Sequence, residues 1–195
     1  PPGLILPPHG HLVAVGFVVH LNYENPYLSP YEEFQRFKTH PLIAPHLEGG
    51  KRVGYGARAL TEGGWQAIPD LVVPGAALLG CAAGFMNVPR IKGSHNAMLS
   101  GELAAEVIAE CLAAGRAHDE PLAYETGWRK SLIGKDLHKV RNVKPLWSKL
   151  GTILGVAAGG LDMWTNELFG LSFFGTLKHG KTDAKSLKPA DQCKP

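Results

Sequence analysis

The 195-residue chain has few cysteines, and none of them forms a metal-binding pair. Cys81, Cys111 and Cys193 lie far apart, and the sequence contains no CxxC motif. Zinc ribbons and iron–sulfur centres need several thiolates at close spacing, so neither can be built from these cysteines alone. Three cysteines also provide no disulfide framework, and a reducing compartment fits that usage. We expect Cys81 to be a small structural residue rather than a redox thiol.

Other signatures of known chemistry are missing as well. No GxGxxG motif occurs, which excludes the first nucleotide-binding fingerprint of a Rossmann unit from this chain. The nine histidines form no HExxH motif and are expected to be surface or packing residues. The chain begins without Met and without a basic segment before an apolar stretch. We therefore expect that these first residues are not a signal peptide and that Pro1 is not the natural start.

Glycine and proline, by contrast, are abundant. Together they make up 39 of 195 residues, or 20%, against a usual value of about 12%. Both residues are costly inside helices, which argues against a helical bundle or a coiled coil. The glycines follow no period and apolar runs separate them, which argues against collagen and low-complexity disorder. The excess predicts many tight turns or close approaches of the backbone.

Apolar patterning predicts several strands. Continuous apolar runs predict buried strands over residues 12–19 and 76–80. Alternation of apolar residues predicts a strand over 51–60, and a brief strand is expected at 71–73.

Helices are expected between and after these strands. A short helix over 31–38 has Ser29 as N-cap and Pro30 in its first turn. A long helix over about 94–114 ends at Gly115, and residues 122–142 are helical and basic. The fold class is therefore a mixed α/β or α+β fold.

Residues 80–95 combine a strand, a loop of small residues and the start of a helix. Free amides at a helix start attract negative charge, and glycine lets backbone approach a ligand closely. This geometry suits a nucleotide diphosphate or the edge of a flavin ring. A tight crossover of an α/β fold that binds no ligand explains the same pattern equally well.

The second half of the chain is basic and apolar. Residues 1–125 carry 8 basic and 12 acidic side chains, whereas 126–195 carry 12 and 5. Within 128–149 seven basic residues accompany one acid, Asp136, and the apolar stretch 150–175 follows. This order favours an anchor at an anionic membrane surface, although a buried helical pair with a solvated basic face is the alternative. Glycines, Asp162 and Glu167 argue against a full span, and the separation of aromatic from basic residues argues against nucleic acid.

Several long segments resemble a known family, the electron transfer flavoprotein–ubiquinone oxidoreductases. The matching segments are residues 25–30, 33–36, 49–60, 62–69, 80–98, 141–142 and 187–190. The resemblance implies an FAD-dependent enzyme that passes electrons from reduced electron transfer flavoprotein to membrane ubiquinone. It implies a glutathione-reductase-type flavoprotein fold with FAD, quinone and 4Fe-4S parts, of which this chain is an internal fragment. The ADP-binding strand–turn–helix and the cysteine cluster of the 4Fe-4S centre are then expected outside it.

The same resemblance implies roles for individual residues. The loop is expected to contact the flavin and ribityl chain, and the helix start is expected to face the O2 side of the flavin. The residues concerned are Gly80, Cys81, Gly84, Phe85, Asn87, Gly93 and Ser94. No catalytic acid, base or nucleophile and no metal ligand is expected. No quinone-contacting residue is assigned, because residues 1–10 do not match the Gly-Gly pair expected before His11.

The resemblance also implies an organisation and a location. Residues 1–70 are expected to form a β-rich quinone-side segment, 71–120 the FAD-contacting segment, and 121–195 a basic helical region with the membrane-associated stretch 150–175. The location is then the matrix side of the mitochondrial inner membrane or a bacterial cytoplasmic membrane. We expect the isolated chain to be inactive and to bind FAD poorly. The alternative is a non-enzymatic membrane-surface module from a truncated gene.

Overall fold

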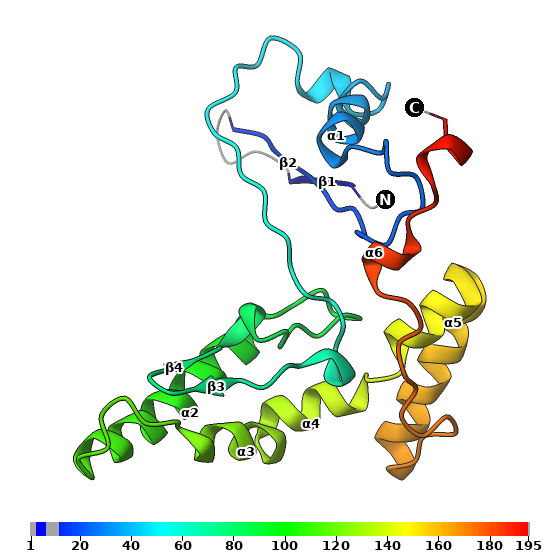
Figure 1. Ribbon diagram of the computed structural model, residues 1–195. Helices are drawn as coiled ribbons and strands as arrows, with labels where there is room; N and C mark the ends of the chain where they lie inside the picture. The colour runs from blue at the N-terminus through cyan, green and yellow to red at the C-terminus, as the bar shows by residue number, and fades with distance from the viewer. Residues whose placement is uncertain (1–2, 7–11, 195) are drawn as a thin grey trace. The chain divides into compact units, whose positions relative to one another are not determined.

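The computed structural model describes residues 3–6 as backbone and residues 12–194 in full (Figure 1). The strands are β1 (Gly3–Leu6), β2 (Ala14–Phe17), β3 (Val72–Val73) and β4 (Ala76–Ala77). The α-helices are α1 (Pro30–Lys38), α2 (Ser94–Ala113), α3 (Leu122–Lys130), α4 (Leu132–Lys139), α5 (Val143–Phe169) and α6 (Asp183–Ser186). Single 3-10 turns occupy Ala44–His46, Trp65–Ala67, Gly80–Ala82 and Ala190–Gln192. The mixed fold class is confirmed.

The chain forms two compact units. Unit 1 comprises residues 1–57 and 181–195, and unit 2 comprises residues 58–180. The segment roles expected for 1–70, 71–120 and 121–195 are functional assignments and stay predictions.

In unit 1 a β-hairpin packs against helix α1. β1 pairs with β2 in antiparallel register, from Gly3 opposite Phe17 to Leu6 opposite Ala14. The Phe17 ring packs on Phe34 and Phe37 of α1, with centroids 6.0 and 5.4 Å apart. Aromatic burial therefore joins the hairpin to the helix.

The expected start of α1 is confirmed. The Ser29 hydroxyl accepts a hydrogen bond from the Glu32 amide at 3.4 Å, and Pro30 occupies the first turn. This cap satisfies an amide that has no partner within the helix, and Pro30 has no amide hydrogen to satisfy.

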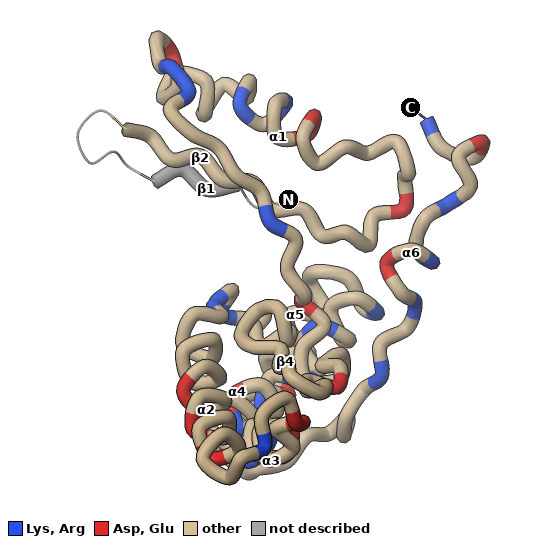
Figure 2. Tube along the Cα trace, turned by 60° about the vertical axis from the view of Figure 1, so that its left-hand side comes forward, with Lys and Arg blue, Asp and Glu red and all other residues tan. Residues whose placement is uncertain are grey.

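The carboxy-terminal segment also belongs to unit 1. The Lys188 amide donates to the Glu24 carbonyl at 2.8 Å, and Asn25 Nδ2 donates to the Lys194 carbonyl at 3.0 Å. Lysines recur along this segment on both sides of α6, as Figure 2 shows.

Three strand predictions need correction. The strand expected over 12–19 is only Ala14–Phe17 and is half exposed, because a two-stranded hairpin offers little surface for burial. No strand forms over 51–60, where Val53 and Tyr55 are 83% and 85% exposed. Alternation alone forms no strand without a partner, and none of the described residues pairs with this stretch. The buried strand expected over 76–80 is limited to β4, with Leu78 and Leu79 exposed.

Unit 2 has its core among α2, α3, α4 and the loop before α2 (Figure 1). The side chains of Tyr124, Trp128, Ile133 and Leu137 are fully buried there, together with Phe85. The β3–β4 hairpin lies against this core through Leu71 and Val72. The brief strand expected at 71–73 is confirmed as β3.

Three helices of unit 2, α2, α3 and α4, follow the expected ranges, whereas no separate helical range was predicted for α5. α2 covers nearly the range predicted, and Gly115 just after it takes a φ of +71°, a left-handed conformation that glycine adopts without strain. The helical region 122–142 is confirmed but broken at Ser131, whose extended backbone ends α3. The Ser131 hydroxyl accepts from the Ile133 amide at 3.1 Å and so caps α4.

α5 consists of two helical parts that meet at Gly151. Its φ of 74° and ψ of −174° break the helix between residues 143–150 and 152–169. Only glycine adopts this conformation without strain. The second part then packs against the first at Gly155 and Gly159, which carry no Cβ atoms to separate the backbones.

Candidate functional site

The predicted flavin-facing loop begins with a glycine in a left-handed conformation. Gly80 has a φ of +55°, and its amide donates to Ser100 Oγ at 2.9 Å. A Cβ atom on Gly80 would lie 2.9 Å from the Cβ of Ala97 in α2. The start of the loop is therefore held directly against the helix that follows it, which requires glycine.

The two ends of the loop meet. A Cβ atom on Gly93, just before α2, would lie 2.6 Å from Cys81 Sγ. Cys81 is half-buried at this contact. Gly84 lies in the middle of the loop and has a φ of +87°. The glycines thus fold residues 80–93 into a compact turn over the start of α2.

Two of the predicted flavin contacts are core residues of unit 2. Phe85 is fully buried, and its ring centroid lies 5.0 Å from that of Trp128. Asn87 is also fully buried, and its backbone pairs with Lys92 through bonds of 2.9 and 3.3 Å. Their contact with flavin stays a prediction, and any such contact would involve backbone rather than exposed side chains.

The start of α2 is open in a way that suits an anionic or oxygen-rich ligand. Gly93 is its N-cap and provides no capping side chain, and the first turn contains no acidic residue. Ser94 is exposed. Because the first amides of a helix have no partner inside it, they remain available to a ligand oxygen. These residues fit the expected FAD contact of Gly93 and Ser94.

A carboxylate that was not among the predicted site residues joins the loop to α4. Asp136 Oδ2 accepts from Asn87 Nδ2 at 2.9 Å and from Asn96 Nδ2 at 3.2 Å. The same oxygen lies 3.1 Å from His95 Nε2, and Asp136 Oδ1 lies 3.1 Å from Arg90 Nη1. The signal in the sequence was that Asp136 is the single acid among the seven basic residues of 128–149.

The pKa of Asp136 reflects these contacts. Burial raises it, but the hydrogen bonds from Asn87, His95 and Asn96 and the charge of Arg90 lower it more. The net effect is a pKa below the ordinary value, so the carboxylate is charged at neutral pH.

A second polar cluster holds the chain after α5 against its start. Asp162 is fully buried and accepts from Asn142 Nδ2 at 3.0 Å and from Ser172 Oγ at 2.6 Å. Asn142 Oδ1 accepts the Leu177 amide at 2.9 Å. Asp162, one of the two acidic residues in the apolar stretch 150–175, is therefore an internal structural group.

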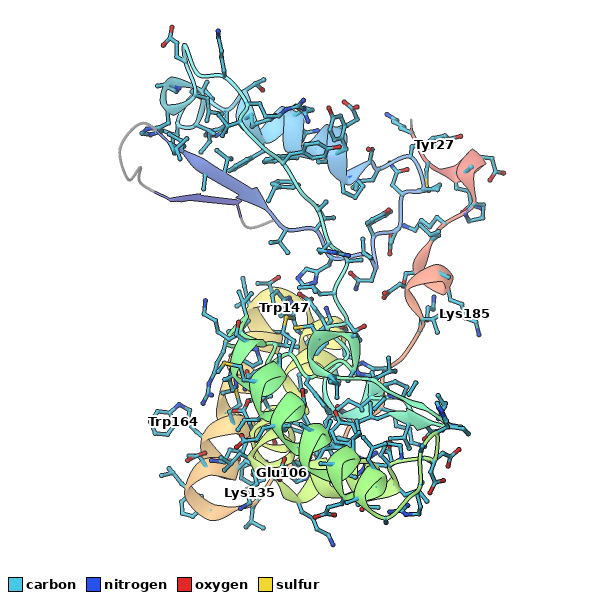
Figure 3. The ribbon with its side chains drawn as sticks, turned by 90° about the vertical axis from the view of Figure 1, so that its left-hand side faces the viewer. Tyr27, Glu106, Lys135, Trp147, Trp164 and Lys185 are labelled. Carbon is cyan, nitrogen blue, oxygen red and sulfur yellow. The ribbon has the colours of Figure 1, made fainter. Side chains whose placement is uncertain are left out.

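The rest of α5 and the chain after it present apolar side chains to the outside. Trp164 is 68% exposed and projects from α5 in Figure 3. The other exposed large apolar residues are Leu150, Ile153, Leu154, Val156, Leu161, Leu168, Phe169, Leu171, Phe173 and Phe174. Within the described part of the chain, no helix is long and apolar enough to cross a membrane. These side chains make up what we call the apolar face of α5, and a concentration of exposed apolar side chains in one segment is typical of a contact surface.

The basic residues before this face are only partly available to a surface. Lys130, Lys135 and Lys149 are exposed, and Lys139 pairs with Glu167 at 2.6 Å. Arg141 is buried and donates from Nη1 to the His138 carbonyl at 2.7 Å. Burial lowers the pKa of Arg141, an effect that the charge of Asp162 opposes. Arg141 is thus a packing residue rather than one of the surface cations expected in 128–149.

Nothing among residues 12–194 resembles a metal site. No group of three or more His, Cys, Asp or Glu side chains in this described part of the chain is arranged to hold a metal ion.

Comparison with known proteins identifies the relatives of this chain. Residues 6–60 match the family model described as "ETF-QO, ubiquinone-binding". The mitochondrial electron transfer flavoprotein-ubiquinone oxidoreductase of Rattus norvegicus is 52% identical over an alignment of 190 residues, which covers 94% of this chain and 30% of the rat protein. The chain is a relative of the electron transfer flavoprotein-ubiquinone oxidoreductases. The resemblance expected from the sequence is confirmed.

Other oxidoreductases of this kind match over the same share. The Homo sapiens protein is 50% identical over 190 residues, and the Dictyostelium discoideum protein is 45% identical over 197 residues. Both are named as mitochondrial. The chain spans about 30% of the length of these electron transfer flavoprotein-ubiquinone oxidoreductases. The match to the ubiquinone-binding description lies almost wholly within unit 1.

Proposed function

We propose that this chain is the quinone-side and FAD-contacting part of an oxidoreductase that passes electrons from reduced electron transfer flavoprotein to ubiquinone. The observation that carries the proposal is the match of residues 6–60 to the ubiquinone-binding family description. Identity of about half over nearly the whole chain to proteins of that name supports it. The partners in this proposal are the flavoprotein and ubiquinone.

Unit 2 supplies the FAD contact in this proposal. The FAD, when bound, carries out the redox chemistry, and the chain binds and orients it. Gly80 and Gly93 bring the backbone of the loop against α2, and no side chain caps the first amides of α2. Gly84, Cys81, Phe85 and Asn87 shape the same loop from within. A partial glutathione-reductase-type flavoprotein fold follows from this assignment.

The apolar face of α5 supplies contact with a membrane surface. Its exposed aromatic and aliphatic side chains suit the acyl boundary, and Lys130, Lys135 and Lys149 suit anionic headgroups. Such a location brings the protein to a lipid-soluble quinone. A non-enzymatic membrane-surface module would share this face but would not bind quinone, and this difference separates the two functions.

Photolabelling with a ubiquinone analogue tests the proposal. The 195-residue chain is mixed with lipid and a photoreactive ubiquinone, irradiated, digested and mapped by mass spectrometry. We expect label within residues 12–57 that excess unlabelled ubiquinone suppresses. Label that appears only in residues 58–180, or that excess ubiquinone does not suppress, would contradict a quinone-binding role for unit 1.

A further inference from the structure

Asp136 collects donors from two separate parts of the site. Asn87 and Arg90 belong to the turn within the loop, whereas His95 and Asn96 belong to the first turn of α2. Asp136 Oδ2 lies within hydrogen-bond distance of Asn87, His95 and Asn96, and Oδ1 accepts from Arg90, so both oxygens of the carboxylate are engaged. Asn96 Nδ2 also donates to the Phe85 carbonyl at 3.0 Å, which extends the connection to the middle of the loop.

Asp136 lies on a helix, α4, that is held rigidly by the core of unit 2. Its helix, α4, buries Ile133 and Leu137 completely on either side of Asp136 in the sequence. The Ser131 hydroxyl caps the same helix, and α4 lies beside α3 in Figure 1. Side chains in a packed core hold defined positions. The position of Asp136 is therefore fixed, and its hydrogen bonds fix the loop residues that donate to it.

Asp136 also supplies the negative charge that the first turn of α2 lacks. The first turn of α2 has neither a capping side chain nor an acidic residue of its own. Asp136 places a negative charge beside that turn and reaches it through His95 and Asn96. Negative charge near a helix start stabilises it, and here the charge comes from another helix and leaves the first amides uncapped.

A surface ion pair with Arg90 would be a simpler role for Asp136, but it does not explain the hydrogen bonds from Asn87 and Asn96. The Arg90 side chain is 64% exposed, and a pair of that kind contributes little to stability. Asn87 and Asn96, in contrast, are fully buried, and their amide groups would lose hydrogen bonds without Asp136. The buried donors therefore define the role of this carboxylate.

We propose that Asp136 is a positioning residue for the flavin-facing surface, holding the 87–92 turn and the first turn of α2 in the geometry that receives FAD. This proposal rests on the FAD contact proposed for residues 80–94. Asp136 acts through Asn87, His95 and Asn96 and does not itself contact the ligand. The ligand class is a flavin nucleotide, recognised by backbone amides at a helix start.

Hydrogen exchange of the 195-residue chain without ligand tests whether the hydrogen bonds of Asp136 hold the loop and the first turn of α2 in place. The reporters are the amides of Asn87, Lys92 and Ala97, each of which donates to a backbone carbonyl within the loop or the first turn of α2. In Asp136→Ala we expect these amides to exchange about tenfold faster, since the turn opens locally. Asp136→Asn should restore most of the protection, because its oxygen can still accept from Asn87 and Asn96, and the donor that replaces Oδ1 loses only the contact with the exposed Arg90.

A matched control removes a different carboxylate. Glu167→Gln, on α5, breaks the exposed pair with Lys139 of α4 and should leave the three reporter amides unchanged. Reporter exchange in Asp136→Ala within about twofold of wild type would overturn the proposal. Equal acceleration throughout unit 2 would overturn it too, because Asp136 would then be a general core residue.

Addition of FAD separates this proposal from the proposed function. Because we expect the isolated chain to bind FAD weakly, FAD is added at about millimolar concentration, which populates a contact with a Kd of about 1 mM. Under these conditions we expect wild type to gain exchange protection within residues 80–95, together with a visible circular dichroism signal from the bound flavin. Asp136→Ala should lose both signals, and Asp136→Asn should keep them. If wild type and Asp136→Ala respond equally to FAD, the positioning role is wrong while the FAD contact stands. If wild type shows no response, the FAD contact itself is contradicted, and the role of Asp136 toward flavin with it.

Discussion

Gly155 and Trp147 face each other across the break in α5 with no room for a side chain between them. A Cβ atom on Gly155 would lie 2.5 Å from the Cα of Trp147 and 2.9 Å from the carbonyl oxygen of Leu146. Backbone atoms cannot give way as a flexible side chain can, so glycine is required here. This contact sets how the second part of α5 folds back on the first, and with it the direction of the exposed apolar face.

Substitution of Gly155 by alanine should therefore destabilise unit 2. We expect a loss of about 2 kcal/mol in the free energy of unfolding, the range typical of overpacking. Gly160→Ala is the matched control, since nothing lies within 4 Å of its added Cβ. That control should be neutral or stabilising by up to about 1 kcal/mol, because alanine favours helix. Urea unfolding measures both, and equal effects would contradict the close packing.

Asn142 should contribute strongly to stability through the second polar cluster. Its side chain bonds Asp162, Ser172, the Gly175 carbonyl and the Leu177 amide. Asn142→Ala leaves the buried Asp162 carboxylate short of a donor, and we expect a cost of about 1–3 kcal/mol. Ser148→Ala, at an exposed position of the same helix, should change the unfolding free energy by less than about 0.5 kcal/mol. A neutral Asn142→Ala would show that the cluster does not hold the chain after α5.

Tyr124 predicts how stability changes at high pH. Burial raises the pKa of its phenol to about 12, an effect that a hydrogen bond with Ser100 partly opposes. The pKa of this phenol in the unfolded chain is about 10, so its pKa is higher in the folded protein. The contribution of the protonated phenol to the free energy of unfolding is therefore complete below pH 10 and is lost as the pH approaches 12. Wild type should lose stability in that window, whereas Tyr124→Phe should not show this loss. Tyr55→Phe, at an exposed tyrosine, is the control and should behave as wild type.

Membrane contact predicts that the chain floats with anionic liposomes and that salt weakens the binding. Trp164→Ser should lower the partition coefficient about tenfold, which corresponds to about 1.4 kcal/mol. Met98→Ser is the control, because Met98 is 77% exposed but lies on α2, away from the apolar face of α5 in sequence. Flotation assays with both variants measure the difference. Equal losses, or no flotation of wild type at low salt, would remove the membrane claim.

Local signals in the sequence predicted the helices well. Ser29 with Pro30, and Gly115 after a long periodic stretch, mark helix ends through backbone chemistry that depends only on neighbouring residues. The strands were predicted poorly, because a strand exists only where a partner lies beside it. Residues 51–60 alternate as a strand should, yet Val53 and Tyr55 are exposed and the stretch has no partner among the described residues.

The site shows the same division between local and distant information. The sequence predicted a tight turn at the glycines of the loop, because glycine adopts left-handed conformations that other residues avoid. Gly80 and Gly84 do adopt such conformations. Asp136 was not, because its partners lie 40 or more residues away in the sequence and only the packing of α4 brings them together. The kink at Gly151 was not predicted either, because several glycines interrupt the apolar stretch and the sequence does not show which of them breaks the helix.

A segment exchange tests the proposed function most directly. The segment of the rat electron transfer flavoprotein-ubiquinone oxidoreductase that aligns with this chain is replaced by the chain's own sequence, and reduction of ubiquinone by reduced electron transfer flavoprotein is measured. The account predicts a chimera that keeps activity within about tenfold of the rat protein, since a cost of about 1.4 kcal/mol at the transition state allows for the differing residues. A chimera that folds as the rat protein does but reduces no ubiquinone would contradict it.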